Sequence, residues 1–129
     1  MLRTGILAFL FAVPGVAMAA SACPITADQL NGSAWDLVSE RGPIVEFALT
    51  TYHGKREFQS WLHFRPASFG TWQFDRCVLV ITEDDGDSDK LVRRLRPLSF
   101  KQNILRVEYE TLGGHRRTVT YRYSSFSND

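Results

Sequence analysis

The sequence offers few groups that could bind a metal ion or carry out a reaction. The acidic stretch Glu83–Asp89 places three aspartates at alternate positions, the spacing with which a calcium-binding loop begins. Lys90 stands where such a loop requires its glycine, and Arg96 stands where it requires a bidentate glutamate. We therefore interpret this stretch as a solvated turn rather than a calcium site.

The histidines and serines show no local signature of catalysis. His53, His63 and His115 do not have the spacing of a metal site, which needs three or four convergent ligands. The chain has no Gly-x-Ser-x-Gly motif and no cysteine close to a histidine. We therefore expect no metal ion, no cofactor and no enzyme activity.

The first 22 residues have the order of features found in a signal peptide. A positive charge at Arg3 precedes the apolar segment 6–13, and small residues at 17–22 fit two alternative cleavage sites. An apolar segment of this length is too short to cross a bilayer as a helix. We expect an exported, periplasmic or secreted protein with one mature domain over residues 23–129.

Cys23 and Cys77 are the two cysteines of the chain, and in an exported protein they most simply form one disulfide. The alternative is that Cys23 is the acylated first residue of a lipoprotein. The segment 20–23 resembles a lipobox, but Ala20 occupies the position where that motif usually carries leucine. We favour the disulfide.

Trp61 is the residue most indicative of recognition. It lies on the polar face of a predicted strand, between Gln59 and His63 and followed by Arg65. Tryptophan and arginine are enriched among interface anchors, so we predict a binding surface at Gln59, Trp61, His63 and Arg65. The alternative interpretation is that another segment covers Trp61.

A second candidate surface is the basic cluster formed by Arg93, Arg94 and Arg96, with further arginines on the last strand. It could bind an acidic partner, but glutamates at 108 and 110 can pair with these arginines, so we favour solvated strand faces. The whole chain has a formal net charge of +1, which gives no reason to expect nucleic-acid binding.

Alternating runs predict the strands that position these residues. The strongest is the hairpin 104–123, where apolar side chains at odd positions share one face in both arms. The residue numbers of two facing residues must then add up to an even number, which requires a connection with an odd number of residues. One such register places Glu110 opposite Arg116.

Shorter runs predict strands at 33–40, 44–51, 56–65, 71–82 and 91–100, the last one interrupted by Pro97. We expect Val45, Phe58, Leu62 and Phe64 to point inward, and residues 66–70 to break the pattern. The connection between 44–51 and 56–65 should have an even number of residues, for example 54–55 or 53–56. Thr26 and Gln29 predict one capped helical turn before the first strand.

Seven or eight short strands without a crossover helix indicate an all-β fold, an antiparallel up-and-down barrel or a sandwich. The segment Leu30–Leu37, with Gly32 and Trp35 at the start of the first strand, resembles small bacterial lipocalin-like (calycin-type) barrels. Two residues separate Gly32 from Trp35 here, whereas lipocalins have one. The resemblance implies a barrel whose base Gly32 and Trp35 close.

The function we expect is that of a protein-interaction module, such as an inhibitor, immunity or accessory factor. The alternative is a lipocalin-like carrier of a small apolar ligand. The many aromatic residues at predicted inward positions can fill an eight-stranded interior, which favours the interaction module.

Overall fold

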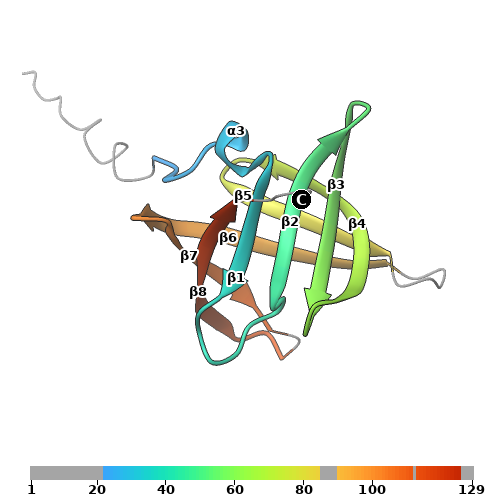
Figure 1. Ribbon diagram of the computed structural model, residues 1–129. Helices are drawn as coiled ribbons and strands as arrows, with labels where there is room; N and C mark the ends of the chain where they lie inside the picture. The colour runs from blue at the N-terminus through green and yellow to red at the C-terminus, as the bar shows by residue number, and fades with distance from the viewer. Residues whose placement is uncertain (1–21, 85–89, 112, 126–129) are drawn as a thin grey trace, which may run out of the picture.

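The computed structural model describes residues 22–84, 90–111 and 113–125 (Figure 1). The predicted signal peptide, apart from its last residue, and positions 85–89 of the acidic stretch lie outside the described residues. Eight antiparallel strands form a closed barrel in sequence order, with β8 beside β1. The strands are β1 (Ser33–Leu37), β2 (Glu46–Tyr52), β3 (Lys55–Leu62), β4 (Arg65–Asp75), β5 (Val78–Asp84), β6 (Lys90–Lys101), β7 (Ile104–Glu110) and β8 (Arg116–Ser125). The all-β prediction is confirmed, and the fold is an up-and-down barrel rather than a sandwich.

The short helix α3 (Ala27–Leu30) covers one end of the barrel, which we call the α3 end. Thr26 caps the helix through the backbone N–H of Gln29, and the Gln29 side chain accepts from the backbone N–H of Thr26 at 2.9 Å, which is the predicted capping box. Leu30 is fully buried. The helix therefore acts as an apolar plug for this end of the barrel.

The predicted disulfide is present and joins Cys23, just before the helix, to Cys77 in the turn between β4 and β5. The two Cα atoms are 5.6 Å apart and the cysteines are 54 positions apart in the sequence. The bond therefore fixes the N-terminal segment across the α3 end of the barrel.

The interior is filled with large side chains. Two buried indoles are hydrogen-bonded, Trp35 donating to Ser33 Oγ at 2.7 Å and Trp72 donating to the Thr50 carbonyl at 3.1 Å. Burial raises the pKa of Tyr121, whose hydroxyl donates to the Ile44 carbonyl at 2.6 Å. The core residues are Ile25, Leu30, Trp35, Ile44, Phe47, Leu49, Phe58, Trp72, Leu79, Ile81, Leu95, Leu105, Val107, Val119 and Tyr121.

Both predictions about loop parity are confirmed. Glu110 faces Arg116, so the β7–β8 connection has five residues, and this is one of the two registers expected for the 104–123 hairpin. Tyr52 faces Lys55, so the β2–β3 connection has two residues. The even number of residues was predicted. Both suggested loops, 54–55 and 53–56, were centred one position too late in the sequence.

Three element predictions were wrong, and tight turns explain two of them. The expected strand 71–82 is divided between β4 and β5 by a turn at Arg76 and Cys77, both with positive φ. The expected strand 56–65 ends at Leu62, because His63 and Phe64 form another such turn. Positions 66–70 do not break the pattern but belong to β4. The expected interruption at Pro97 is confirmed as a register shift between Pro97 and Ser99.

The alternation of strand directions gives the barrel a second end, which we call the distal end. It carries the β1–β2 connection 38–45, the β3–β4 turn 63–64 and the β7–β8 connection 111–115. In Figure 1 the α3 end is uppermost and the distal end lies below. Val45, Leu62 and Phe64, expected in the core, are exposed here, because Leu62 is the last residue of β3 and the other two lie in connections beyond the strand ends.

Candidate functional site

Gln59 and Trp61 lie together on the outer faces of β2, β3 and β4, a region that we call the Trp61 surface. Gln59 stands between Ala48 and Phe69, and Trp61 stands between Glu46 and Pro66. Trp61 is half-buried. Gln59 and Trp61 share the outer face of β3, as the alternation of the strand predicted. Their role in binding remains a prediction.

A shallow groove of about 230 Å³ runs across this surface. Ala48 forms its floor and is only 3% exposed although it points away from the barrel axis, because larger side chains surround it. Phe69 forms an exposed apolar wall. The groove is lined by Ala48, Thr50, Glu57, Phe58, Gln59, Trp61, Phe69 and Gly70. The volume of the groove is large enough to accept a side chain of a partner.

His63 and Arg65 are not assembled with Trp61 as the sequence predicted. The prediction extended β3 through position 65, but the strand turns back after Leu62. Leu62 faces Arg65 across the turn, so Arg65 points to the same side as Leu62, opposite to the side of Trp61. His63 is exposed within the turn itself.

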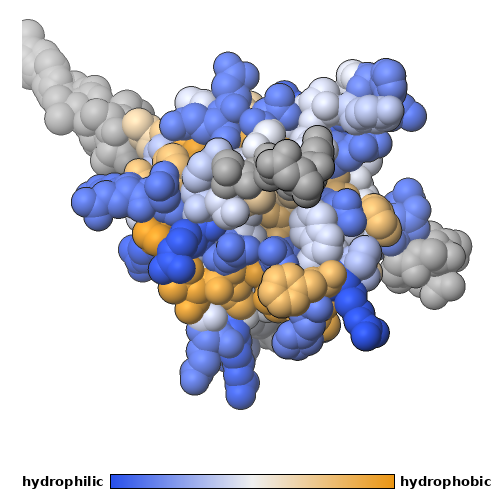
Figure 2. Space-filling view, viewed as in Figure 1, coloured by the Kyte–Doolittle hydropathy of each residue, from blue (hydrophilic) through white to orange (hydrophobic). Residues whose placement is uncertain are grey.

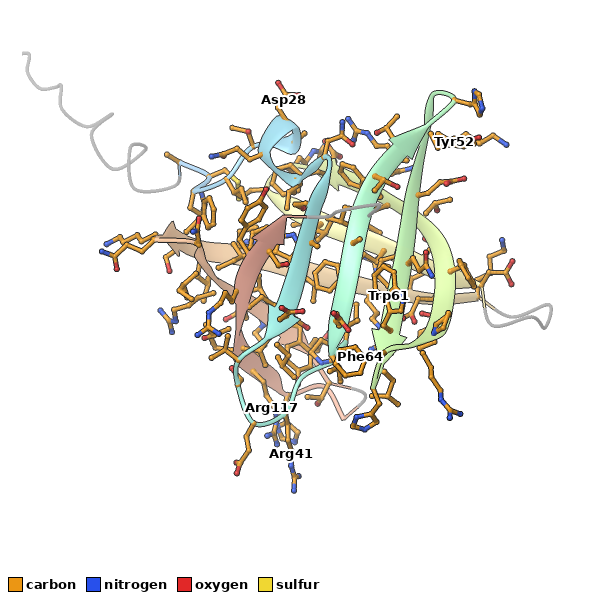
Figure 3. All side chains as sticks on the ribbon, in the orientation of Figure 1. Asp28, Arg41, Tyr52, Trp61, Phe64 and Arg117 are labelled. Carbon is orange, nitrogen blue, oxygen red and sulfur yellow. A yellow bond between two sulfur atoms is a disulfide. The ribbon has the colours of Figure 1, made fainter. Side chains whose placement is uncertain are left out.

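Phe64 is the residue that sequence reasoning missed. It is 93% exposed and has a φ of 67°, a left-handed conformation that bulky residues rarely adopt. A two-residue turn of this kind normally uses asparagine and glycine. Because His63 and Phe64 carry no such signal, the alternation of β3 seemed to continue and placed Phe64 inward. Figure 3 shows Phe64 at the lower end of β3, below Trp61.

Phe64 lies in an apolar region at the distal end, which we call the distal apolar patch and define as Val38, Val45, Leu62 and Phe64. All four side chains are exposed. The β2–β3 ladder ends with Glu46 facing Trp61, and Val45 and Leu62 are the next residues beyond that pair. The backbone N–H of Leu37 donates to the Val45 carbonyl at 2.8 Å, which holds Val38 nearby. Figure 2 shows this apolar region on the lower half of the same face.

Two carboxylates border the Trp61 surface. Glu46 faces Asp36 on β1 and Trp61 on β3. Burial raises the pKa of Glu46, and the charge of Asp36 and a hydrogen bond with it raise that pKa further. The arrangement places negative charge beside an aromatic ring, which suits a cationic side chain on a partner.

A chain of polar groups lies on the inner wall near the distal end. Ser60 and Ser68 share a hydrogen bond of 2.6 Å, and Ser68 donates to Glu83 Oε1 at 2.8 Å. Arg93 donates to the other carboxylate oxygen of Glu83. Glu83 as a residue is only 8% exposed. Ser60 contacts Ser68, and Ser68 contacts a carboxylate rather than a histidine, so the geometry of the network is that of a structural link between four strands.

The described residues contain no group of three or more potential metal ligands among His, Cys, Asp and Glu. The hollows of about 160, 360 and 230 Å³ all open to solvent, and the barrel interior is occupied by the core. The expectation of no enzyme activity remains a prediction.

The class defined by these observations is an eight-stranded up-and-down β-barrel with a disulfide-anchored N-terminal segment. Comparisons with protein-family models, with curated proteins and with solved structures found no match for this chain. Within the part of the chain that the structure describes, no helix has the length and apolar character needed to cross a membrane.

Proposed function

We propose that this protein is an exported interaction module that binds a partner protein through the Trp61 surface and the distal apolar patch. The observation that carries the proposal is the 93% exposure of Phe64 at the tip of the β3–β4 turn, beside the exposed side chain of Leu62. The positive φ belongs to the hairpin turn and is shared by the turns at 76–77 and 102–103, but only the 63–64 turn among these three presents a fully exposed aromatic ring, which contributes almost nothing to the core.

The composition of this region supports the proposal. Aromatic side chains provide a large, rigid contact area at low entropic cost, and they are enriched at the centres of interfaces. Trp61 and Phe69 flank the groove, and Phe64 extends the aromatic surface to the distal end. Gln59 and Glu46 supply polar groups beside them. Apolar anchors with polar neighbours are the usual anatomy of a protein interface.

The filled interior favours a protein partner over a small apolar ligand. A carrier barrel encloses a chamber for its ligand, as lipocalins do. Here Trp35, Phe47, Phe58, Trp72 and Tyr121 occupy that space, each at most 1% exposed. The closed topology and the burial of Trp35 in the first strand support a lipocalin-like architecture without a lipocalin-like cavity.

An exported location agrees with this function. The predicted signal peptide and the Cys23–Cys77 disulfide both fit an oxidising compartment such as the periplasm or the exterior. A sulfur atom bonded to Cys77 cannot also carry a lipid, so the disulfide argues against the lipoprotein alternative.

Photo-crosslinking in an extract of the producing cells tests the proposal. A photoreactive residue introduced at position 62 should capture one protein reproducibly, and Phe64→Ser should abolish that capture. Tyr52→Ser is the matched control, because Tyr52 is an exposed aromatic residue at the α3 end, beside the β2–β3 turn. Equal capture by the two variants, or the recovery of a bound small molecule in place of a protein, would reject the proposal.

A further inference from the structure

Among the residues that the structure describes, the first half of β6 has a paired strand on one side only. Residues 90–95 pair with β5, but the β6–β7 ladder begins only at Arg96, which faces Glu108. The same register would bring Leu95 opposite Tyr109, and those two residues are not paired. Alternate residues of a strand direct their N–H and C=O groups toward each neighbour. Residues 90–95 therefore direct backbone groups toward a side where the described residues form no ladder with them, and we call this side the β6–β7 gap.

A hollow of about 360 Å³ occupies this gap. It extends from the first half of β6 to the end of β7 and is partly covered by Pro43 of the β1–β2 connection. Its lining residues are Pro43, Leu91, Val92, Arg93, Arg94, Leu95, Tyr109, Glu110 and Thr111. β7 lies four strands from β3 in the barrel order, so the gap is on the other side of the molecule from Trp61.

The inner side of the gap is mostly apolar. Leu91 faces the buried Glu83, and Leu95 faces the buried Leu79, so both point toward the barrel interior. Tyr109 follows Leu105 and Val107 on the inward face of β7 and is half-buried. Arg93 lies between the two leucines on the same face, where it is bonded to Glu83, so a strand entering the gap would direct alternate side chains toward Leu91, Leu95 and Tyr109 and toward the Arg93–Glu83 pair.

The outer side of the gap carries three arginines and two glutamates, an excess of positive charge. Arg94, Arg96 and Arg116 line an adjoining hollow of about 160 Å³ with Glu108 and Glu110. Glu108 lies 3.9 Å from Arg96 and 3.8 Å from Arg116, so one carboxylate is shared by two guanidinium groups. Arg94 forms no ion pair with any residue that the structure describes.

We propose that this gap binds an extended acidic segment of a protein partner, which adds as a strand beside residues 90–95. Its backbone would pair with the open side of β6, a common mode of peptide recognition. Apolar side chains would face Leu91, Leu95 and Tyr109, and acidic side chains would face the arginines. The segment that fits best therefore alternates acidic and apolar residues.

Peptide binding to the purified full chain tests this inference. The probe is a labelled, end-capped hexapeptide of alternating glutamate and valine, and its binding is followed by fluorescence anisotropy. We expect saturable binding, which falls by about tenfold in Arg94→Gln, the loss typical of one charge-assisted hydrogen bond. Arg106→Gln is the matched control, because Arg106 is exposed on β7, which borders the gap, but lines neither hollow.

Two altered peptides separate the contributions of charge and of backbone pairing. Replacement of glutamate by lysine should abolish binding, and N-methylation of alternate amides should abolish it as well, because it removes the donors that pair with β6. The inference is overturned if the original peptide does not bind, if either altered peptide binds as well, or if Arg106→Gln weakens binding as much as Arg94→Gln. No partner protein is required, so this outcome is independent of the Trp61 surface.

Discussion

At the scale of single residues, the Trp61 surface contains features that stability alone does not explain. Asp36 and Glu46 face each other directly, and like charges in such a cross-strand pair are unfavourable. Phe64 exposes its ring in the left-handed region. Positive φ also occurs in the turns at 76–77 and 102–103, so what distinguishes this region is an exposed aromatic ring and a like-charge pair next to the predicted anchor.

Glu46→Gln should stabilise the protein at neutral pH. The folded state raises the pKa of Glu46, so ionisation of this group costs folding free energy. Its favourable contribution is present below the unfolded pKa near 4.5 and is lost as pH rises through the folded pKa. We expect a gain of about 0.5 kcal/mol at pH 7, in the range of one cross-strand pair, and almost none at pH 3.

Urea unfolding at the two pH values measures this difference. The control is Glu57→Gln, which changes a glutamate on the same outer face that lies between Thr50 and Thr71 rather than beside an acid. An equal gain for Glu46→Gln at pH 7 and pH 3 would show that repulsion from Asp36 is not the cause.

At the scale of elements, the polar network links β3, β4, β5 and β6 near the distal end. Ser60, Ser68, Glu83 and Arg93 contribute one side chain from each strand. Gly70 allows β4 to approach β5 closely here, since a Cβ atom would lie 1.9 Å from the Thr82 carbonyl oxygen. The network therefore holds the strands that carry Trp61 to the strand that borders the β6–β7 gap.

Arg93→Met should destabilise the protein by about 2 kcal/mol, because it leaves the largely buried Glu83 carboxylate without its cation. The double variant Glu83→Gln/Arg93→Met should recover much of this loss, since glutamine still accepts the Ser68 hydroxyl without a charge. Denaturant unfolding of the wild type, both single variants and the double variant gives the coupling free energy. Additive effects of the two changes would contradict the pairing.

Sequence prediction succeeded for some elements and failed for others. The 104–123 hairpin was predicted with its faces and parity, because its apolar residues alternate without interruption. The turns at 63–64, 76–77 and 102–103 have positive φ without a glycine, so local composition did not reveal the first two. Each missed turn reversed the chain within an apparently continuous run. His63 and Arg65 were misplaced, and Phe64 was missed, for this reason.

At the scale of the whole molecule, the barrel has two unlike ends. The α3 end is plugged by Ile25 and Leu30 and secured by the disulfide. The distal end exposes apolar side chains. A small domain has a limited core, so we expect the disulfide to contribute substantially to the stability of this one.

Cys23→Ser/Cys77→Ser should lower the free energy of unfolding by about 4 kcal/mol, the chain-entropy effect of a loop closed across 54 positions. Denaturant unfolding of the double variant and of oxidised wild type measures the difference. Thiol titration of the native oxidised protein should find no free thiol. Two titratable thiols, or an unchanged unfolding midpoint, would contradict the disulfide.

The most direct test of the central claim is the affinity of the captured partner for purified wild-type protein, Trp61→Ala and Phe64→Ser, each measured beside a thermal unfolding curve. We predict that both variants weaken binding by about 2 kcal/mol or more, the level that marks an interface anchor. Phe64→Ser should unfold within a few degrees of the wild type, because its ring contributes almost no buried area. Unchanged affinity in both variants would contradict the account and place the interface elsewhere on the barrel.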